Sequence, residues 1–471
     1  MSESYRRRSF GHIGIALVIF AFCLSAAPAI AQVLYGSITG TVKDTQGSTV
    51  PGATVTIVNK ETNLTRDTVT NAEGAYNLVN VPAGTYDVKI SLQGFREGVR
   101  SNVPVTIGQI SRIDMALEVG TVSETVTVAS EAQLLQTDKA DVSTELKSAE
   151  ITAMPLNRFR NYQALLNLVP GTTPMAFGNA ETDTPARSLA TNVNGQANTN
   201  NSTRTDGATN MNIWLPNHNM LISPAETIDT VNVSTSSFDA EQGMAGGGAV
   251  TVITKSGTNQ FRGSAFEFYN SDGLNANSFY FGAGQVPKKL PLNQNTYGGT
   301  VGGPIAKNKV FFFGSFEGYK RTQDLTTAFN VPDEALRRGD LSKATNNAGT
   351  PQTIYNPFTG SANGVGRVPF EGNIIPSNLI DPIALKVLQL YPLPNTTGSG
   401  LGGFTRNYER VESRSTDRDN YDLKINWNRT GSNQIWGKYS YFNAEVDDLT
   451  NYLGPDPNAT GDGGFTKVWS P

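Results

Sequence analysis

The sequence contains almost no cysteine or histidine. Its 471 residues include one cysteine, Cys23, and two histidines, His12 and His218, and only His218 lies beyond the first 31 residues. Beyond residue 31 the chain therefore has no thiol for a disulfide, for a Cys-based zinc site or for a cysteine nucleophile. No Ser or Asp constellation is recognisable around His218, which we expect to be a solvated loop residue. We therefore predict no enzyme, no catalytic residues, no metal and no cofactor.

The chain also lacks a large net charge of either sign. The formal net charge is −4, and no basic patch stands out along the chain, so nucleic acid is a poor candidate partner. The N-terminus does carry a local charge, Arg6 to Arg8, followed by an apolar run from Ile13 to Leu24. This pattern is typical of a secretory signal and is too short to span a membrane comfortably. The chain is therefore expected to be exported.

A cleavage site follows the apolar run. Ala29 and Ala31 form an A-x-A motif, which predicts cleavage before Gln32 and a signal peptide over residues 1–31.

Short strand-like runs dominate the next segment. They recur every ~8–12 residues with turn sequences between several of them, which predicts an all-β sandwich of about seven strands. Val55 and Ile57 share one face of their run, as do Tyr86, Val88 and Ile90. The predicted strands are Ser37–Lys43, Thr54–Asn59, Thr65–Thr70, Ala75–Asn80, Thr85–Leu92, Val103–Ile107 and Ser111–Leu117.

The wording of this segment, GSITGTVKDTQGSTVPGATVTI and then TNAEGAYNLVNVPAGTYDVKISLQGF, resembles the carboxypeptidase regulatory-like domain. The resemblance implies a transthyretin- or immunoglobulin-like sandwich over residues 32–118, of a type often described as carbohydrate-binding-like. It does not imply peptidase activity, because a zinc carboxypeptidase needs two His and one Glu on its metal. A glycan-binding role and a role as a spacer both remain open.

A linker over residues 119–137 follows the sandwich. Within it, Glu124, Thr125, Val126, Thr127 and Val128 form an extended, β-branched segment with polar flanks. Such a segment can add as a strand to the sheet edge of a partner. It resembles a TonB box, which implies the periplasmic protein TonB as a partner; a plain linker strand is the alternative.

Residues 138–256 resemble the plug of a TonB-dependent receptor, of mixed α+β structure. A short helix is predicted where Tyr162, Leu165, Leu166 and Val169 recur at helical spacing before Pro170-Gly171. Strand-like segments at 192–196, 205–209 and 226–234 resemble strands and turns of that domain, and Gly246 to Gly248 predict a tight turn.

From Gln260 onward the β signal strengthens, and the strictest alternation, with aromatic residues near the strand ends, comes late in the chain. Tyr421, Leu423, Ile425 and Trp427 alternate with Asp422, Lys424, Asn426 and Asn428, and Ile435, Gly437, Tyr439 and Tyr441 alternate with Trp436, Lys438 and Ser440. This alternation is typical of membrane strands with one side facing lipid and the other facing the lumen of a barrel. A water-soluble antiparallel sheet with one wet face gives the same pattern.

Three motifs favour the membrane interpretation. The turn TKSGTN at 254–259, GGTVGGPI at 298–305 and KNKVFFF at 307–313 resemble Oar-like TonB-dependent outer-membrane receptors. The resemblance implies that residues 257–471 are the first strands of an antiparallel transmembrane β-barrel, with a long extracellular loop at 322–415 that contains one helix, Pro382 to Leu390. About five strands are visible where ~22 are expected, so we expect the N-terminal part of a longer receptor.

The sequence thus predicts a mainly β protein of the outer membrane, with its sandwich and TonB box in the periplasm. The resemblance implies ligand binding and energised uptake, with TonB, the inner-membrane energising complex and outer-membrane lipid as partners. The extracellular ligand, whether glycan, peptide or siderophore, stays open. The alternative is a secreted or surface-attached carbohydrate-binding or adhesion protein without transport.

Overall fold

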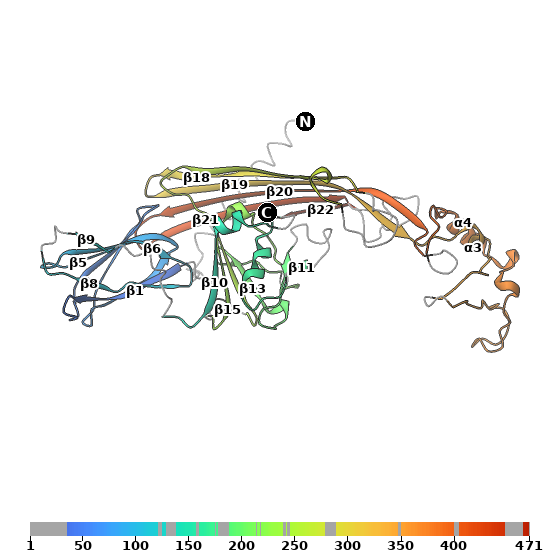
Figure 1. Ribbon diagram of the computed structural model, residues 1–471, viewed down its shortest axis with the longest axis horizontal. Helices are drawn as coiled ribbons and strands as arrows, with labels where there is room; N and C mark the ends of the chain where they lie inside the picture. The colour runs from blue at the N-terminus through green and yellow to red at the C-terminus, as the bar shows by residue number, and fades with distance from the viewer. Residues whose placement is uncertain are drawn as a thin grey trace, which may run out of the picture. The chain divides into compact units, whose positions relative to one another are not determined.

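A computed structural model of the chain is mainly β, with few and short helices (Figure 1). It describes residues 35–120, 125–128, 138–156, 160–174, 176–177, 188–212, 214–216, 218–238, 242, 245–277, 289–346, 350–399, 405–447 and 465–470. No helix within these ranges is long and apolar enough to cross a membrane. The expected signal peptide and its cleavage residues Ala29, Ala31 and Gln32 lie outside them.

The described residues form two compact units, and each is considered by itself. The first comprises residues from Met1–Glu145, Asn200–Met211 and Val231–Ile253, and the second residues from Leu146–Thr199, Asn212–Thr230 and Thr254–Pro471.

The predicted sandwich is present in the first unit, with eight strands before residue 118. They are β1 (Tyr35–Asp44), β2 (Thr54–Asn59), β3 (Thr65–Val69), β4 (Ala75–Pro82), β5 (Gly84–Ser91), β6 (Glu97–Val105), β7 (Ile110–Arg112) and β8 (Met115–Leu117). Two predictions were wrong in detail. The sixth strand starts at Glu97 rather than Val103, and the last predicted strand is divided into β7 and β8.

Two sheets face each other in the sandwich. In one, β1 pairs antiparallel with β4 and parallel with β7 and β8; in the other, the order is β3-β2-β5-β6-β9. The alternating apolar residues pack into one core between the sheets, as predicted. Its buried members are Ile38, Val42, Val50, Ala53, Val55, Ile57, Tyr76, Leu78, Val81, Tyr86, Val88, Ile90, Val103, Val105, Ile113, Met115 and Leu117.

Two tyrosines bring hydroxyl groups into this core, and each finds a main-chain acceptor. The Tyr76 hydroxyl donates to the carbonyl of Ile113 at 2.8 Å, and that of Tyr86 donates to the carbonyl of Pro82 at 2.9 Å. A buried hydroxyl without a partner would destabilise the fold. Burial raises the pKa of Tyr86 to about 12 and also raises that of Tyr76, so both hydroxyls stay protonated donors at neutral pH.

The middle region, residues 138–256, combines a small sheet with short helices. The sheet has the order β10-β15-β16-β13-β14, and β13 pairs parallel with β16. Its strands are β10 (Val142–Lys147), β13 (Ser202–Thr205), β14 (Ala208–Thr209), β15 (Ile228–Ser236) and β16 (Ala249–Thr254); β11 (Ala176–Phe177) and β12 (Leu189–Ala190) pair with each other. The helices are α2 (Ser148–Ala153) and the 3-10 turns η1 (Tyr162–Leu168), η2 (Asn198–Asn200) and η3 (Ala225–Thr227).

The predicted helix with the apolar stripe is η1. Tyr162, Leu165, Leu166 and Val169 are all buried, as the spacing required. The Asn161 side chain accepts a hydrogen bond from the Gln163 N–H and so caps the start of η1. The chain leaves the helix at Pro170-Gly171, where Gly171 has a positive φ of 87°.

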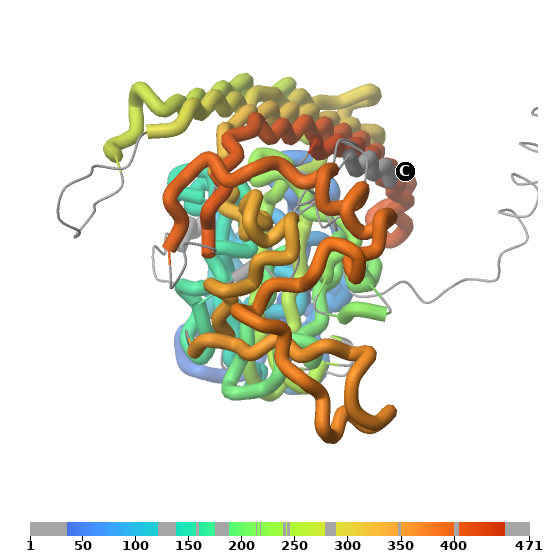
Figure 2. The backbone as a smooth tube through the Cα atoms, turned by 90° about the vertical axis from the view of Figure 1, so that its right-hand side faces the viewer, coloured from blue at the N-terminus to red at the C-terminus, as the bar shows by residue number. Residues whose placement is uncertain are grey.

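A sheet of long antiparallel strands lies in the second unit. Among the described residues it has the order β17-β18-β19-β20-β21-β22, with each strand paired to the next in sequence, and Figure 2 shows β17 to β21 side by side in one layer, from yellow-green to red. They are β17 (Arg262–Ser271), β18 (Leu292–Ala306), β19 (Val310–Phe329), β20 (Tyr408–Asn428), β21 (Gln434–Asp447) and β22 (Phe465–Ser470).

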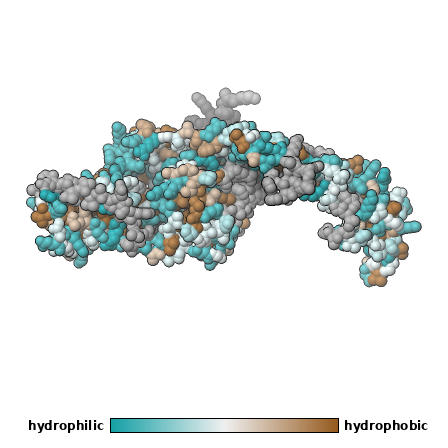
Figure 3. Space-filling view, in the orientation of Figure 1, coloured by the Kyte–Doolittle hydropathy of each residue, from teal (hydrophilic) through white to brown (hydrophobic). Residues whose placement is uncertain are grey.

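The connection between β19 and β20 is shorter than the loop expected at 322–415. The two strands stay paired to the level of Phe329 and Tyr408, so the connection covers residues 330–407. It contains α4 (Pro382–Gln389), which confirms the predicted helix, α3 (Glu334–Arg337), and the 3-10 turns η6 (Glu371–Asn373) and η7 (Ser377–Leu379). Its exposed apolar side chains, Phe358 and Ile383 among them, lie scattered between hydrophilic ones (Figure 3).

Candidate functional site

The expected TonB-box segment forms a strand on the edge of the sandwich. Residues Thr125–Val128 are β9, which pairs parallel with β6 from Glu97↔Thr125 to Arg100↔Val128. Glu124 lies outside the described residues. In the sheet order β9 is the terminal strand, and β6 pairs antiparallel with β5 on its other side. Without β9, residues 97–100 of β6 would present unpaired main-chain groups, as edge strands do.

The start of the linker is also attached to the sandwich. Val119 forms an isolated bridge with Phe95, and the N–H of Gly120 donates to the carbonyl of Gly94 at 3.1 Å. Beside them Arg96 and Glu118 form an ion pair at 2.9 Å, with both side chains partly exposed.

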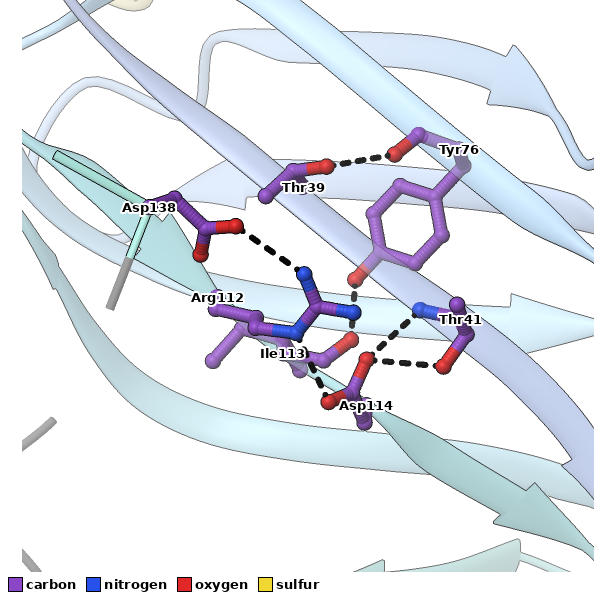
Figure 4. A network of polar contacts seen from close by, with 7 residues as sticks. All are labelled: Thr39, Thr41, Tyr76, Arg112, Ile113, Asp114 and Asp138. Atoms are coloured by element: carbon purple, nitrogen blue, oxygen red, sulfur yellow. Dashed lines mark hydrogen bonds and ion pairs between the residues drawn. The ribbon is translucent and has the colours of Figure 1, made fainter. Parts of the chain in front are cut away.

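Arg112 of the sandwich contacts Asp138, the residue directly after the linker. Its Nη1 lies 3.1 Å from Oδ1 of Asp138, and its Nε lies 3.0 Å from Oδ2 of Asp114 (Figure 4). Asp114 also accepts hydrogen bonds from the N–H and the hydroxyl of Thr41, both at 2.8 Å. Burial alone would raise the pKa of Asp114, but the hydrogen bonds from Arg112 and Thr41 outweigh it and hold that pKa below its usual value.

The second candidate feature is the face of the long sheet that carries polar side chains. On β20, one face is buried although it is polar, and the other is exposed although it is apolar. The buried residues are Thr416, Arg418, Asn420, Asp422 and Lys424, and the exposed ones are Tyr421, Leu423, Ile425 and Trp427. This is the reverse of a sheet that folds in water, where the apolar face is covered. The predicted alternation is thus confirmed, with its apolar side outward.

Middle-region residues of the same unit bind this polar face. Lys424 Nζ donates to the carbonyl of Thr254 at 3.1 Å and to its hydroxyl at 3.3 Å, and the hydroxyls of Thr227 and Ser315 lie 2.8 Å apart. Asp422 is 3.1 Å from Lys438 Nζ and accepts from the Ser440 hydroxyl at 2.5 Å. A buried lysine and carboxylate are tolerated here because charge and hydrogen bonds compensate them.

Arg160 makes a further link between the middle region and the sheet. Its Nη2 lies 3.2 Å from Glu226 Oε1, and its guanidinium lies over the rings of Phe268 and Phe266 on β17, 3.9 and 5.1 Å from their centroids. The Arg160 side chain is 9% exposed and that of Glu226 15%, so the ion pair is largely shielded from water. Glu317 of β19 is also buried, close enough to Arg418 and Arg160 to be attracted by their charges.

The three motifs that suggested a membrane receptor meet at one place. A Cβ at Gly257, in TKSGTN, would lie 2.2 Å from the carbonyl oxygen of Phe312, in KNKVFFF, and 2.7 Å from that of Gly303, in GGTVGGPI. Only glycine permits this approach. Asn259 and Asn308 add two hydrogen bonds at 2.8 Å, so the motifs encode the entry into β17.

Lys255, in the turn TKSGTN, binds the middle-region segment at Glu226 and Thr227. Lys255 Nζ donates to the carbonyl of Glu226 at 2.8 Å, and its main-chain N–H donates to the carbonyl of Thr227 at 2.8 Å. Burial lowers the pKa of Lys255, and the charges of Glu226 and Asp229 oppose this effect.

His218 is not the solvated loop residue that was expected. It is 7% exposed, its main chain bonds to Leu215 and Asn212, and neither ring nitrogen has a hydrogen-bond partner. Trp214 in the same loop is 85% exposed. In the described part of the chain, no three His, Cys, Asp or Glu side chains are grouped so as to hold a metal ion.

Comparison with known families and proteins finds two domain families and a curated transporter that this chain resembles. Residues 253–469 match the outer membrane beta barrel domain, and residues 37–118 match the carboxypeptidase regulatory-like domain. The TonB-dependent transporter Oar of Myxococcus xanthus is 26% identical over 336 residues, which are 68% of this chain and 30% of that protein. The chain therefore spans about a third of the length of this curated relative.

Two solved receptors share a coarser likeness. The ferric enterobactin receptor PfeA of Pseudomonas aeruginosa matches with a TM-score of 0.34 and 12% identity, over 69% of this chain and 36% of its own. The siderophore receptor PirA of Acinetobacter baumannii matches with a TM-score of 0.31 and 15% identity, over 69% of this chain and 44% of its own. At TM-scores this low, neither likeness bears on the fold.

Proposed function

We propose that this outer-membrane protein, a homologue of the TonB-dependent transporter Oar, takes part in the energised uptake of a ligand across the outer membrane. The observation that carries the proposal is strand β20 of the second unit's sheet, whose apolar residues from Tyr421 to Trp427 are exposed while its polar residues are buried and Lys424 bonds to the middle region. Lipid on one side and a plug on the other would satisfy both faces. Open sheet edges cannot face lipid, so the transport form needs further strands to close the sheet.

Each region then has a role. The signal peptide, residues 1–31, directs export, and the sandwich of residues 32–118 stands in the periplasm. The linker, residues 119–137, presents residues 124–128 to TonB. Residues 138–256 act as the plug inside a barrel that begins at residue 257, and residues 330–407 face the outside and contact the ligand.

Energy enters through the linker in this scheme. TonB adds to residues 124–128 as a strand, and the inner-membrane energising complex pulls on it. The pull reaches the middle region, whose hydrogen bonds to the polar face, such as Lys424 to Thr254, must break or shift for a passage to open. Polar contacts suit such a movement, because water entering the passage can replace them. No covalent chemistry is involved.

If the protein were instead a secreted carbohydrate-binding protein, the whole sheet would lie in water. In water, the exposed apolar row of β20, Tyr421 to Trp427, would need a cover. In lipid this apolar row can stay exposed. The difference favours the transporter over the secreted protein.

Deletion of residues 123–129 tests the proposal. Labelled glycans, peptides and siderophores are first screened for binding to cells that carry the wild-type receptor. The deletion variant should bind the selected ligand like the wild type and fail to take it up. The matched control replaces residues 119–123 with Gly and Ser at unchanged length and should retain uptake. Unchanged uptake in the deletion variant would contradict the proposal.

A further inference from the structure

The linker and Asp138, the residue that follows it, are attached to the sandwich at three successive points along the chain. Gly120 bonds to Gly94, residues 125–128 pair with β6, and Asp138 pairs with Arg112. Two of these contacts are made by main-chain hydrogen bonds and the third is an ion pair. A single chance contact would not bring the beginning of the linker, its middle and the residue that follows it to the same domain.

Each of these contacts is weak enough to be reversible. β9 has only four paired residues, and a main-chain hydrogen bond exchanges protein for water with little net gain. The Arg112 and Asp138 side chains are 37% and 26% exposed, so water and salt screen their attraction. Docked and released states of the linker can therefore exchange without unfolding the sandwich, whose core lies elsewhere.

The position of Asp138 gives the attachment a mechanical consequence. Asp138 lies after residues 125–128 and before β10, the first strand of the middle region. A pull applied at residues 125–128 is therefore borne by the sandwich for as long as Arg112 holds Asp138. Force can reach the middle region only after this ion pair has parted.

We propose that the sandwich is a dock for the linker: β6 holds residues 125–128 as its edge strand, Arg112 holds Asp138, and the energising partner binds the segment after it has left β6. The inference rests on the proposed function. The partner is a periplasmic protein with a free sheet edge, because such an edge offers the same main-chain hydrogen bonds as residues 97–100 of β6. In this proposal β6 and the partner compete for residues 125–128.

A disulfide across β6 and β9 tests the dock. Val99 and Thr127 are register partners, and directly paired residues have the Cα spacing of about 4.4–6.8 Å that a disulfide needs. A Cβ at Gly98 would lie 2.4 Å from Sδ of Met115 in the core, so Val99, one residue on, faces away from the core. The variant Val99→Cys/Thr127→Cys therefore leaves the packing of the sandwich intact.

The control pair is Glu97→Cys/Val128→Cys, which is three residues out of register and on opposite faces of the ladder. Both variants are made in the full-length receptor in outer-membrane vesicles, oxidised mildly, and probed with the purified C-terminal domain of TonB. Each protein is measured again after reduction, so every sample is its own folding control.

The dock predicts that the 99/127 pair oxidises at least tenfold faster than the 97/128 pair. The oxidised 99/127 protein should bind the TonB domain at least tenfold more weakly, and reduction should restore binding. Equal oxidation of the two pairs, or full binding by the oxidised 99/127 protein, would overturn the dock alone. If the reduced proteins and the wild type fail to bind TonB, the proposed function and the dock are both contradicted.

Discussion

Lys424 Nζ lies 3.1 Å from the carbonyl oxygen of Thr254, so a strand of the long sheet holds the last residue of β16. Both residues are buried. The contact joins a charge on the polar face of the sheet to the point where the chain leaves the middle region for β17.

Replacing this lysine should loosen the middle region. The variant Lys424→Met leaves the Thr254 carbonyl without its charged donor, a loss of about 1–3 kcal/mol. We expect normal amounts of receptor in the outer membrane but faster proteolysis of residues 138–256. Lys309→Met, in the exposed turn between β18 and β19, is the matched control. Identical proteolysis of the two variants would show that the Lys424 contact does not hold the middle region.

The two faces of β20 should respond oppositely to a new charge. Ile425 is exposed on the apolar face, and its neighbour Asn426 lies on the other face. Arginine on a lipid-facing position costs about 2–4 kcal/mol at the bilayer midplane and less near the interfaces. Ile425→Arg should therefore lower the yield of the heat-modifiable folded form in outer membranes more than Asn426→Arg does. Equal yields would mean that lipid does not cover Ile425.

Asp114 should make the stability of the sandwich depend on pH. Its pKa is lowered in the fold, so its carboxylate contributes stability above the unfolded pKa of about 3.9 and loses it as pH falls through the folded value. In urea unfolding of the fragment 35–120, Asp114→Asn should lower the midpoint at pH 7. The difference from the wild type should shrink at pH 3. A difference that stays constant with pH would assign the effect of the substitution to packing.

Much of the fold could be predicted because its strands alternate. In the sandwich, Val55, Ile57, Tyr86, Val88 and Ile90 all lie in the core, as their spacing required. On β20 the same periodicity identified the two faces of the strand, although it could not say which face is buried. The resemblance of the three motifs to outer-membrane receptors indicated that the apolar face is the one turned to lipid.

The misplaced loop limits also have a physical cause. β19 and β20 continue to Phe329 and Tyr408 through sequences rich in Thr, Glu and Arg. These strand ends lack a long apolar row, so the alternation that marks a membrane strand is absent although the ladder continues. Strand ends beyond an apolar band need no such row.

Contacts between distant segments could not be predicted. β9 pairs in parallel with a strand that begins 28 residues earlier, and the pattern of Glu97 to Arg100 gives no sign of it. His218 was misjudged because its neighbours, Asn and Pro, are typical of exposed loops, whereas the surrounding fold buries it. The TonB-box interpretation of residues 124–128 stays a prediction.

The most direct test of the account is site-specific photo-cross-linking at residue 126 of the full-length receptor in energised cells. We predict an adduct between position 126 and TonB that disappears in cells lacking TonB. A cross-linker at Val69, on β3 at the opposite edge of the same sheet, should give no such adduct. The absence of a TonB adduct at 126, or equal adducts at 126 and 69, would contradict the claim that this segment receives the energy for transport.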